Sequence, residues 1–303
     1  MPAFLLGTGF FILQSGNRDQ CAESELNPRI DLLAEILDRV RQRQPVVHAI
    51  NNVVTANDVA NVLRAVGARP ILAFAVEEVA EIVSGADALV LNLGTPTAER
   101  VKAMILAGRQ ANSLGKPVIF DPVGVGASRF RMESARQILT EVHVGIIKGN
   151  RAEIGSLAGM GGSLRGLDAV DGPADLRTAA EGLSRETKAV VVVSGERDLV
   201  VDDGGTVVVE NGHPLMGRVT GTGCMLAALI GAFTAVEADR LIATVAAIAC
   251  FGLAGERAGE KSDGPGSFKM ALFDSLYQLA VKDIRERAKI RWSKFSLPHI
   301  IRP

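Results

Sequence analysis

Short, almost wholly apolar runs alternate with longer amphipathic stretches over most of the chain. The runs are VVHAI, PILAF, ALVLNL, PVIFD, VGIIK and AVVVVSG, and stretches with helical spacing of apolar residues separate them. A strand that is apolar on both faces must be covered on both faces, and helices between successive strands allow those strands to pair in parallel. The sequence therefore predicts an α/β fold, one layered sandwich with a mostly parallel central sheet and helices on either side.

The ends of the folded domain follow from local signals. Asn27-Pro28 precedes IDLLAEILDRVRQRQ, which predicts a helix with an Asn cap and Pro in its first turn. We expect an N-terminal extension of unknown role over residues 1–27, a single domain over 28–292 and a C-terminal tail over 293–303. The Gly- and Asp-rich stretch 159–173 predicts a loop, and 198–212 predicts a hairpin turning at Asp203-Gly204-Gly205. From Gly221 onward the pattern is nearly all helix.

Charge and cysteine usage exclude several classes of protein. The 33 Lys and Arg against 34 Asp and Glu leave a net charge of -1, so no basic field favours nucleic acid or an anionic membrane surface. The three cysteines are odd in number and widely spaced, which predicts a reducing compartment and no disulfide framework.

Two apolar stretches are considered as membrane segments. Residues 3–13 follow no Lys or Arg and fall short of the ~20 residues that cross a bilayer. We expect a cytosolic extension there, with a degenerate targeting segment as the alternative. Residues 241–259 contain glycines and end in charges, which is typical of a buried core helix. We therefore expect a cytoplasmic protein without a membrane partner.

The motif Gly221-Thr222-Gly223-Cys224 directly precedes the apolar run MLAALIGAFTAV. Glycines ahead of a helix let backbone N–H groups converge on an anion at the positive end of the helix dipole. The motif predicts a phosphate or oxyanion cradle, and the alternative is a tight turn with close helix packing. Cys224 at a helix N-terminus can have a lowered pKa and act as a base or nucleophile. Alternatively it is a small buried thiol.

Charged residues follow the strands PVIFD and VGIIK. Ligands of open parallel sheets bind beyond the carboxyl ends of the strands, so Asp121 is placed to hold a metal or polarise water, or else to cap the next helix. Lys148 suits a phosphate as a point charge. Glu153, in the first turn of the next helix, either reaches a Mg²⁺ or complements the helix dipole.

Neutral polar groups follow two other strands. Ser194 could touch a nucleotide phosphate or belong to an ordinary turn. His48, Asn51 and Asn52 suit an uncharged heterocycle or an alcohol, or form a network of turn caps. The sequence contains no GxxxxGK[ST], strand-following GxGxxG, GxSxG or HExxH motif, which removes the main support for P-loop, dinucleotide, hydrolase and zincin readings.

Taken together, the segments resemble one family. HAINNVVTANDVANVLRAVGARPILAFAVEEV, ALVLNLGT, ANSLGKPVIFDPVGVGASRFR, IIKGNRAEIGSLAG, SGERD and NGHPLMGRVTGTGCMLAALIGAFTAV are similar, in this order, to hydroxyethylthiazole kinases of thiamine salvage. The similarity runs from about Ile30 to the last long helix. It implies a ribokinase-like three-layer fold without a separate lid domain, and a homotrimer with active sites at subunit interfaces.

The resemblance also implies a reaction and its residues. ATP would donate its γ-phosphoryl group to the hydroxyl of 4-methyl-5-(2-hydroxyethyl)thiazole, with Mg²⁺ as cofactor. Gly221 would lie at the thiazole site and form the anion hole with Gly223, and Cys224 would accept the hydroxyl proton or line the site. Lys148 and Ser194 would contact ATP, and Asp121 and Glu153 would hold Mg²⁺ directly or through water.

The chain departs from the family's pattern near the substrate. Leu72 replaces the family's usual Met and keeps its apolar volume; with His48 and Asn52 it is expected to contact the thiazole. Asn51-Asn52 replaces the usual Thr-Asn, and Lys148 replaces a frequent Arg, which keeps the charge but loses bidentate geometry. The alternatives are a ribokinase-like kinase for hydroxymethylpyrimidine or a sugar, whose members usually have Asp in place of Cys224, or a non-catalytic ligand-binding relative.

Overall fold

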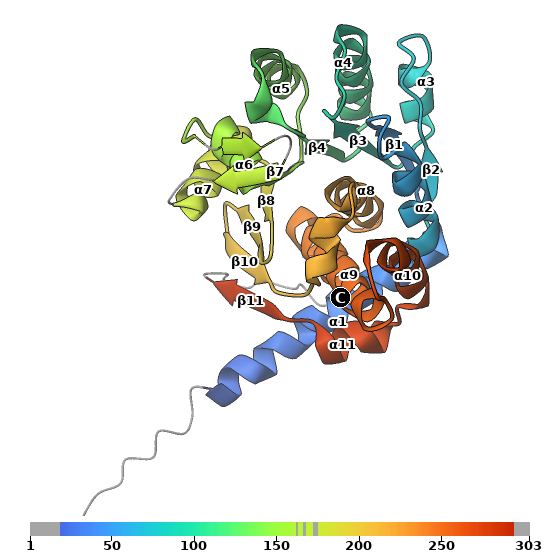
Figure 1. Cartoon of the computed structure of the whole chain (residues 1–303), viewed down its shortest axis with the longest axis vertical. Coiled ribbons are helices and arrows are strands. Elements are labelled where there is room, and N and C mark those ends of the chain that lie inside the picture. Colours follow the sequence, from blue (N-terminus) through green and yellow to red (C-terminus); the bar gives the residue numbers. More distant parts are fainter. Residues whose placement is uncertain (1–18, 162, 166–167, 172–174, 294–303) are drawn as a thin grey trace, which may run out of the picture.

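The computed structural model describes residues 19–161, 163–165, 168–171 and 175–293, and one large sheet forms the centre of this part of the chain (Figure 1). Its nine strands lie in the order β11 (Ile290–Ser293), β10 (Gly205–Val209), β9 (Asp198–Asp202), β8 (Val190–Ser194), β5 (Ile146–Asn150), β4 (Val118–Asp121), β3 (Ala88–Asn92), β1 (Val46–Ile50) and β2 (Arg69–Ile71). The strands from β2 to β8 pair in parallel, and β9, β10 and β11 pair antiparallel. The predicted α/β fold with a mostly parallel sheet is confirmed.

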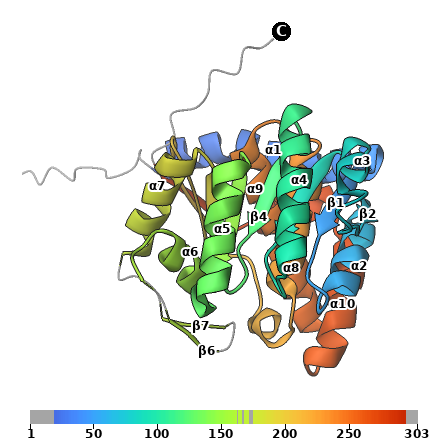
Figure 2. The same ribbon diagram turned by 90° about the horizontal axis from the view of Figure 1, so that it is seen from above.

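Helices cover both faces of the sheet. On one side are α1 (Asp19–Arg43), α2 (Ala56–Val66), α8 (Thr222–Thr234), α9 (Arg240–Glu260), α10 (Pro265–Gln278) and α11 (Val281–Arg287). On the other side are α3 (Val79–Ser84), α4 (Ala98–Ser113), α5 (Arg129–Glu141), α6 (Arg151–Leu157) and α7 (Leu176–Thr187). The sheet curves around α8 and α9 in Figure 1, and Figure 2 shows α3, α4, α5 and α7 standing side by side on the opposite face.

The alternation of side chains along the strands determines which residues face α8. One residue on each of three neighbouring strands belongs to the apolar cluster that contains α8: Val90, Ile119 and Ile146. Because successive side chains of a strand point to opposite faces, the residue two positions later returns to the same face. On these strands that residue is polar: Asn92, Asp121 and Lys148. Three buried polar side chains therefore reach the α8 side at the carboxyl edge of the sheet.

Several elements differ from their prediction. The predicted hairpin of β9 and β10 is confirmed. The predicted loop over 159–173 is wrong in part, because β6 (Ser163–Arg165) and β7 (Asp168–Asp171) pair antiparallel within it. The nearly all-helical C-terminal part ends in the strand β11, which pairs with β10. The first helix begins at Asp19, before Asn27-Pro28, so the predicted cap and first-turn proline lie inside it.

The apolar helix α9 belongs to the core. It is long and apolar enough to cross a membrane, yet 83% of its most apolar window is buried inside the protein. The core-helix prediction for 241–259 is therefore confirmed. The apolar run 3–13 and the tail from residue 294 lie outside the described residues.

Candidate active site

The polar side chains at the carboxyl edge of the sheet meet the first turn of α8. Gly221 precedes this helix with φ +95°, a left-handed conformation that favours glycine. A Cβ at Gly221 would lie 2.6 Å from Cγ2 of Thr55, so a side chain there would also collide with its neighbour. The first N–H groups of α8 have no partner within the helix and point toward this edge.

The ammonium group of Lys148 lies beside the first turn of α8. A Cβ at Gly223 would be 2.8 Å from Nζ of Lys148, so glycine here gives the ammonium its space. Lys148 is only 3% exposed. Burial acts to lower the pKa of Lys148, but the carboxylates of Asp121 and Glu153 outweigh it and the pKa is raised. A permanent positive charge thus lies next to the positive end of a helix, an arrangement that favours an anion between them.

Asp121 is the acidic partner of Lys148. Its Oδ1 lies 3.6 Å from Nζ of Lys148 and has no hydrogen-bond partner, although the residue is 1% exposed. Burial raises the pKa of Asp121 to about 7 against the opposing charge of Lys148, and Glu153 adds to the rise. A buried carboxylate oxygen without a hydrogen bond costs free energy unless a cation completes its shell.

Glu153 is held by backbone groups on both of its oxygens. Oε1 accepts a hydrogen bond from Gly124 N at 2.8 Å, and Oε2 accepts one from Asn150 N at 2.7 Å. The Asn150 side chain accepts from Ala152 N and Glu153 N in return, which makes a capping box at the start of α6. Glu153 therefore contributes charge to the site while its oxygens serve the loop after β4 and the start of α6.

A chain of amide side chains joins the loop after β1 to Asp121. Nδ2 of Asn92 donates to Oδ2 of Asp121 at 2.7 Å, and Oδ1 of Asn92 accepts from Nδ2 of Asn52 at 2.9 Å and from Gly94 N at 3.0 Å. Asn92 and Asp121 are paired residues on the neighbouring strands β3 and β4. Asn92 was not among the site residues that the sequence predicted. Its position at the end of the buried run ALVLN, matching Asp121 at the end of PVIFD, is the signal that could have found it.

Asn52 uses its hydrogen-bonding groups inside the protein. Its two amide hydrogens face Oγ1 of Thr55 at 2.8 Å and Asn92 at 2.9 Å, and its Oδ1 accepts from the backbone N–H groups of Val54 and Thr55. Cys224 Sγ lies farther away, at 3.5 Å. The two nearer acceptors take both hydrogens of Nδ2, so Asn52 gives the sulfur little support.

The thiol of Cys224 is 9% exposed and lies close to this amide chain. Burial, followed by the negative charge of Asp121, raises the pKa of Cys224, and the opposing Lys148 does not reverse the change. The expectation of a lowered pKa at the start of α8 is therefore wrong, because burial of the thiol and the neighbouring Asp121 carboxylate raise the pKa of Cys224. At neutral pH the thiol is protonated.

Ser194 ends β8 opposite Asn150 on β5. Its Oγ donates to the carbonyl of Gly149 at 3.3 Å. Asp198 shapes the turn that follows, since its Oδ1 accepts from Gly195 N at 3.0 Å. Burial raises the pKa of Asp198 to about 6, against the Gly195 N–H and the charge of Lys148.

His48 lies apart from this cluster of polar groups, whereas Leu72 packs on the α8 side of the sheet. His48 alternates with Val47 and Ala49, which face α8, so its ring points to the opposite face of the sheet. There Nε2 bonds to the carbonyl of Ala73 at 2.9 Å, and burial lowers the pKa of His48, which keeps the ring neutral. Leu72 follows β2 and packs half-buried against the cluster that contains Cys224. Of the residues predicted at the substrate, the structure brings Gly221 and Asn52 next to Cys224 and gives His48 a separate environment.

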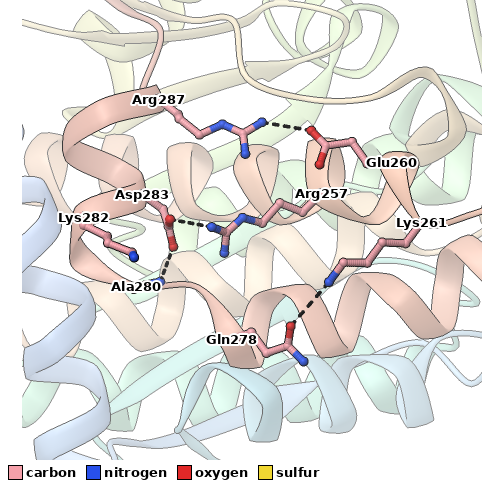
Figure 3. Close-up of a pocket in the computed structure, with 8 residues that line it drawn as sticks. All are labelled: Arg257, Glu260, Lys261, Gln278, Ala280, Lys282, Asp283 and Arg287. Atoms are coloured by element: carbon pink, nitrogen blue, oxygen red, sulfur yellow. Dashed lines mark hydrogen bonds and ion pairs between the residues drawn. The ribbon is translucent and has the colours of Figure 1, made fainter.

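A hollow of about 480 Å³ lies elsewhere, between the ends of α9, α10 and α11 (Figure 3). Its charged side chains bond largely to one another: Arg257 pairs with Asp283, and Arg287 lies 3.1 Å from Glu260. Both pairs join α9 to α11. The described residues contain no group of three or more His, Cys, Asp or Glu that could hold a metal.

Comparison with known proteins agrees with the order of these motifs. The model of the "Hydroxyethylthiazole kinase family" matches residues 37–282, which is most of the chain. The chain belongs to this family. The resemblance drawn from the sequence is thereby confirmed, and membership of the hydroxyethylthiazole kinase family makes the chain a kinase.

The alignments with individual relatives extend over nearly the whole length of each relative. The hydroxyethylthiazole kinase of Thermoanaerobacter pseudethanolicus is 50% identical over 260 residues, 85% of this chain and 98% of the relative. That of Chloroflexus aggregans is 48% identical over 260 residues, 86% and 94% of the two chains. The solved hydroxyethylthiazole kinase of Pyrococcus horikoshii superimposes with a TM-score of 0.79 at 43% identity, covering 86% of this chain and 98% of that one. A pyridoxal kinase from Staphylococcus aureus, at 15% identity and a TM-score of 0.53, shares the fold.

Proposed function

We propose that the protein transfers the γ-phosphoryl group of ATP to the hydroxyl of 4-methyl-5-(2-hydroxyethyl)thiazole, within thiamine salvage. The observation that carries the proposal is the convergence of three groups at one edge of the sheet. These are the buried ammonium group of Lys148, a buried oxygen of Asp121 that lacks a hydrogen bond, and the N-terminus of α8. Phosphoryl transfer asks a protein mainly to position the reactants and neutralise charge, and these groups supply both. The name of the matching family supports the choice of acceptor.

ATP would bind along the carboxyl edge from β8 to α8. Lys148 would meet the transferred phosphoryl group, and the free N–H groups of Thr222 and Gly223 would share its negative charge. Ser194, one strand away from Lys148, would reach another phosphate oxygen of ATP. The helix holds the two N–H groups in position, whereas the Ser194 hydroxyl would exchange its hydrogen bond to the Gly149 carbonyl for one to the nucleotide.

Mg²⁺ fits this edge through Asp121. Its Oδ1 is buried and lacks a hydrogen bond, which suits an oxygen ligand of a hard cation. Both oxygens of Glu153 accept backbone N–H groups, so Glu153 would act by its charge or through water. When bound, Mg²⁺ would reduce the charge of the phosphates. Asp121 would hold it and Lys148 would then turn from Asp121 toward the phosphoryl group.

The alcohol would approach Gly221, with Leu72 forming an aliphatic wall. Cys224 lies at the junction of this region and Lys148, and its protonated thiol would line the site. The hydroxyl proton would then pass late to an oxygen of the transferred phosphoryl group or to water, after most of the bond to the leaving oxygen is broken, as a loose transition state allows.

Exposed apolar side chains beside the site support the proposed homotrimer, and the three widely spaced cysteines support the proposed cytoplasmic location. Val53 and Val54, immediately after Asn52, are each 64% exposed, and Phe74 after β2 is 48% exposed. Apolar side chains gathered beside a site are typical of a protein contact. A second subunit there would cover them and complete the acceptor pocket. Sedimentation velocity of the wild type and of Val53→Glu tests this: we expect a trimer and a smaller species, respectively, and a monomeric, fully active wild type would contradict it.

A substrate panel tests the reaction. Purified protein with Mg-ATP should release ADP in proportion to added thiazole alcohol, and ³¹P NMR should show a new phosphate monoester. Hydroxymethylpyrimidine and ribose serve as comparison acceptors under the same conditions. Faster turnover of either comparison acceptor, or no acceptor-dependent ADP from folded protein, would overturn the proposal.

A further inference from the structure

We propose that Asn92 is a positioning residue that orients the Asp121 carboxylate and links it to the loop at the acceptor end of the site. The inference rests on the proposed role of Asp121 as a cation ligand. Asn92 is 1% exposed and lies between Asp121 and Asn52, with hydrogen bonds to both. It touches no reacting atom in this arrangement, so its influence passes through Asp121.

Backbone groups set the direction of each hydrogen bond in the series that joins Asn52, Asn92 and Asp121. Gly94 N can only donate, so the atom of Asn92 that faces it is the oxygen, Oδ1. The other side of the amide, Nδ2, must then face Asp121, where it donates to Oδ2. The N–H groups of Val54 and Thr55 fix Asn52 in the same way and turn its Nδ2 toward Asn92.

The direction of these hydrogen bonds determines which oxygen of Asp121 stays without a hydrogen bond. With Oδ2 bound to Asn92, the carboxylate cannot rotate without breaking a short buried hydrogen bond. Oδ1 is then the oxygen that faces Lys148 and has no hydrogen bond. Such second-layer hydrogen bonds to a metal ligand change metal affinity by roughly 10–100-fold when they are removed.

The same series of hydrogen bonds extends to the proposed site of the acceptor alcohol. Asn52 also donates to Thr55, whose methyl group is the atom that a side chain at Gly221 would meet. A displacement of the loop after β1 is therefore transmitted through Asn52 and Asn92 to the carboxylate. The structure thus provides a physical connection between the proposed alcohol site and the proposed cation site.

Mn²⁺ binding, followed by electron paramagnetic resonance in the presence of ADP, tests the inference without turnover. We expect Asn92→Ala to weaken Mn²⁺ binding by roughly 10–100-fold relative to the wild type. Asn52→Ala should weaken it less, because Gly94 N still holds Asn92. In kinetics, the Mg²⁺ concentration for half-maximal rate should rise and kcat fall, while KM for ATP at saturating Mg²⁺ changes little.

Asn211→Ala is the matched control. Asn211 is a buried amide with three hydrogen bonds of its own, to Glu256, Arg287 and Lys289. It should lose comparable thermal stability and keep wild-type Mn²⁺ affinity. Asn92→Ser serves if Asn92→Ala does not fold, since its hydroxyl cannot span both Asp121 and Gly94.

The outcomes separate this inference from the proposed function. Equal Mn²⁺ affinity of wild type and the Asn92 variants, or an equal loss in Asn211→Ala, would overturn the positioning role and leave the kinase proposal standing. A wild type that binds no Mn²⁺ with ADP would overturn the role of Asp121 as a cation ligand, and the positioning role with it.

Discussion

Position 221 admits glycine alone for two independent reasons, its left-handed backbone and its contact with Thr55. We predict that Gly221→Val lowers kcat/KM at least ~100-fold, since it displaces donors that would face the transferred group. The strained backbone should cost about 1–3 kcal/mol of stability. Steady-state kinetics with circular dichroism as a fold check measure both. Gly217→Ala, where an added Cβ meets nothing within 4 Å, is the control, and near-normal activity of Gly221→Val would refute the site.

Cys224 gives the second prediction at this scale. Because the pKa of its thiol is raised, no thiolate is present at neutral pH to act as a base. A true general base contributes about 10²–10⁴-fold, so we expect Cys224→Ala to lose less than ~10-fold in kcat. Native Cys224 should react with iodoacetamide far more slowly than a free thiol at pH 7.5. Cys250, a core cysteine whose pKa burial raises to about 12, provides the unreactive reference. A loss of 100-fold would restore the base role.

At the level of single residues, the sequence predicted which chemical groups lie at the site better than it predicted which residues contact them. Lys148, Asp121 and Cys224 converge because alternation along β4 and β5 turns the first two toward the start of α8. The lowered thiol pKa was wrong because burial depends on three-dimensional packing that a local motif does not contain. Asn52 could not be recognised as fully hydrogen-bonded, since Asn92 lies 40 residues away.

At the scale of elements, the start of α6 joins helix stability to the site. Asn150 caps this helix, and Glu153 closes the capping box. Asn150→Ala should cost about 1 kcal/mol of stability through the lost cap. It should also lower kcat, by up to roughly 10-fold, because the lost cap loosens the first turn of α6 that carries Glu153, although the backbone N–H of Asn150 still binds Oε2 of Glu153. Chemical denaturation and initial rates measure the two effects.

Asp239→Ala is the matched variant, because Asp239 caps α9 through Ile242 N. It should lose similar stability and keep full activity. If both caps affected activity alike, the link between Asn150 and the site would be absent.

The elements that the sequence predicted are those with continuous apolar periodicity, and the ones it missed are short. β6, β7 and β11 have three or four residues each, and pairing with another strand defines them more than composition does. The helix over Arg240–Glu260 was predictable because its apolar run is long. Its burial then distinguishes it from a membrane span.

For the whole molecule, a partly exposed carboxyl at the edge of the site makes stability depend on pH. The pKa of Asp198 is about 6 in the native state and 3.8 as its ordinary value. Between these values the native state binds the proton more tightly than the unfolded state, so stability declines as the pH rises. The difference of about two pKa units corresponds to at most ~3 kcal/mol, and partial exposure reduces it to about 1–2 kcal/mol.

Asp198→Asn isolates this contribution, because the amide oxygen can still accept from Gly195 N while the charge is gone. The free energy of unfolding from urea titrations should fall between pH 4 and pH 7 by about 1–2 kcal/mol more in the wild type than in Asp198→Asn, and the difference should then stay constant to pH 8. Asp263→Asn, at an exposed aspartate, should follow the wild type across this range. A wild type that gained stability relative to Asp198→Asn as the pH rose would mean that Lys148 outweighs burial at Asp198. The positive charge at the start of α8 would then be shared among more carboxylates than Asp121 and Glu153.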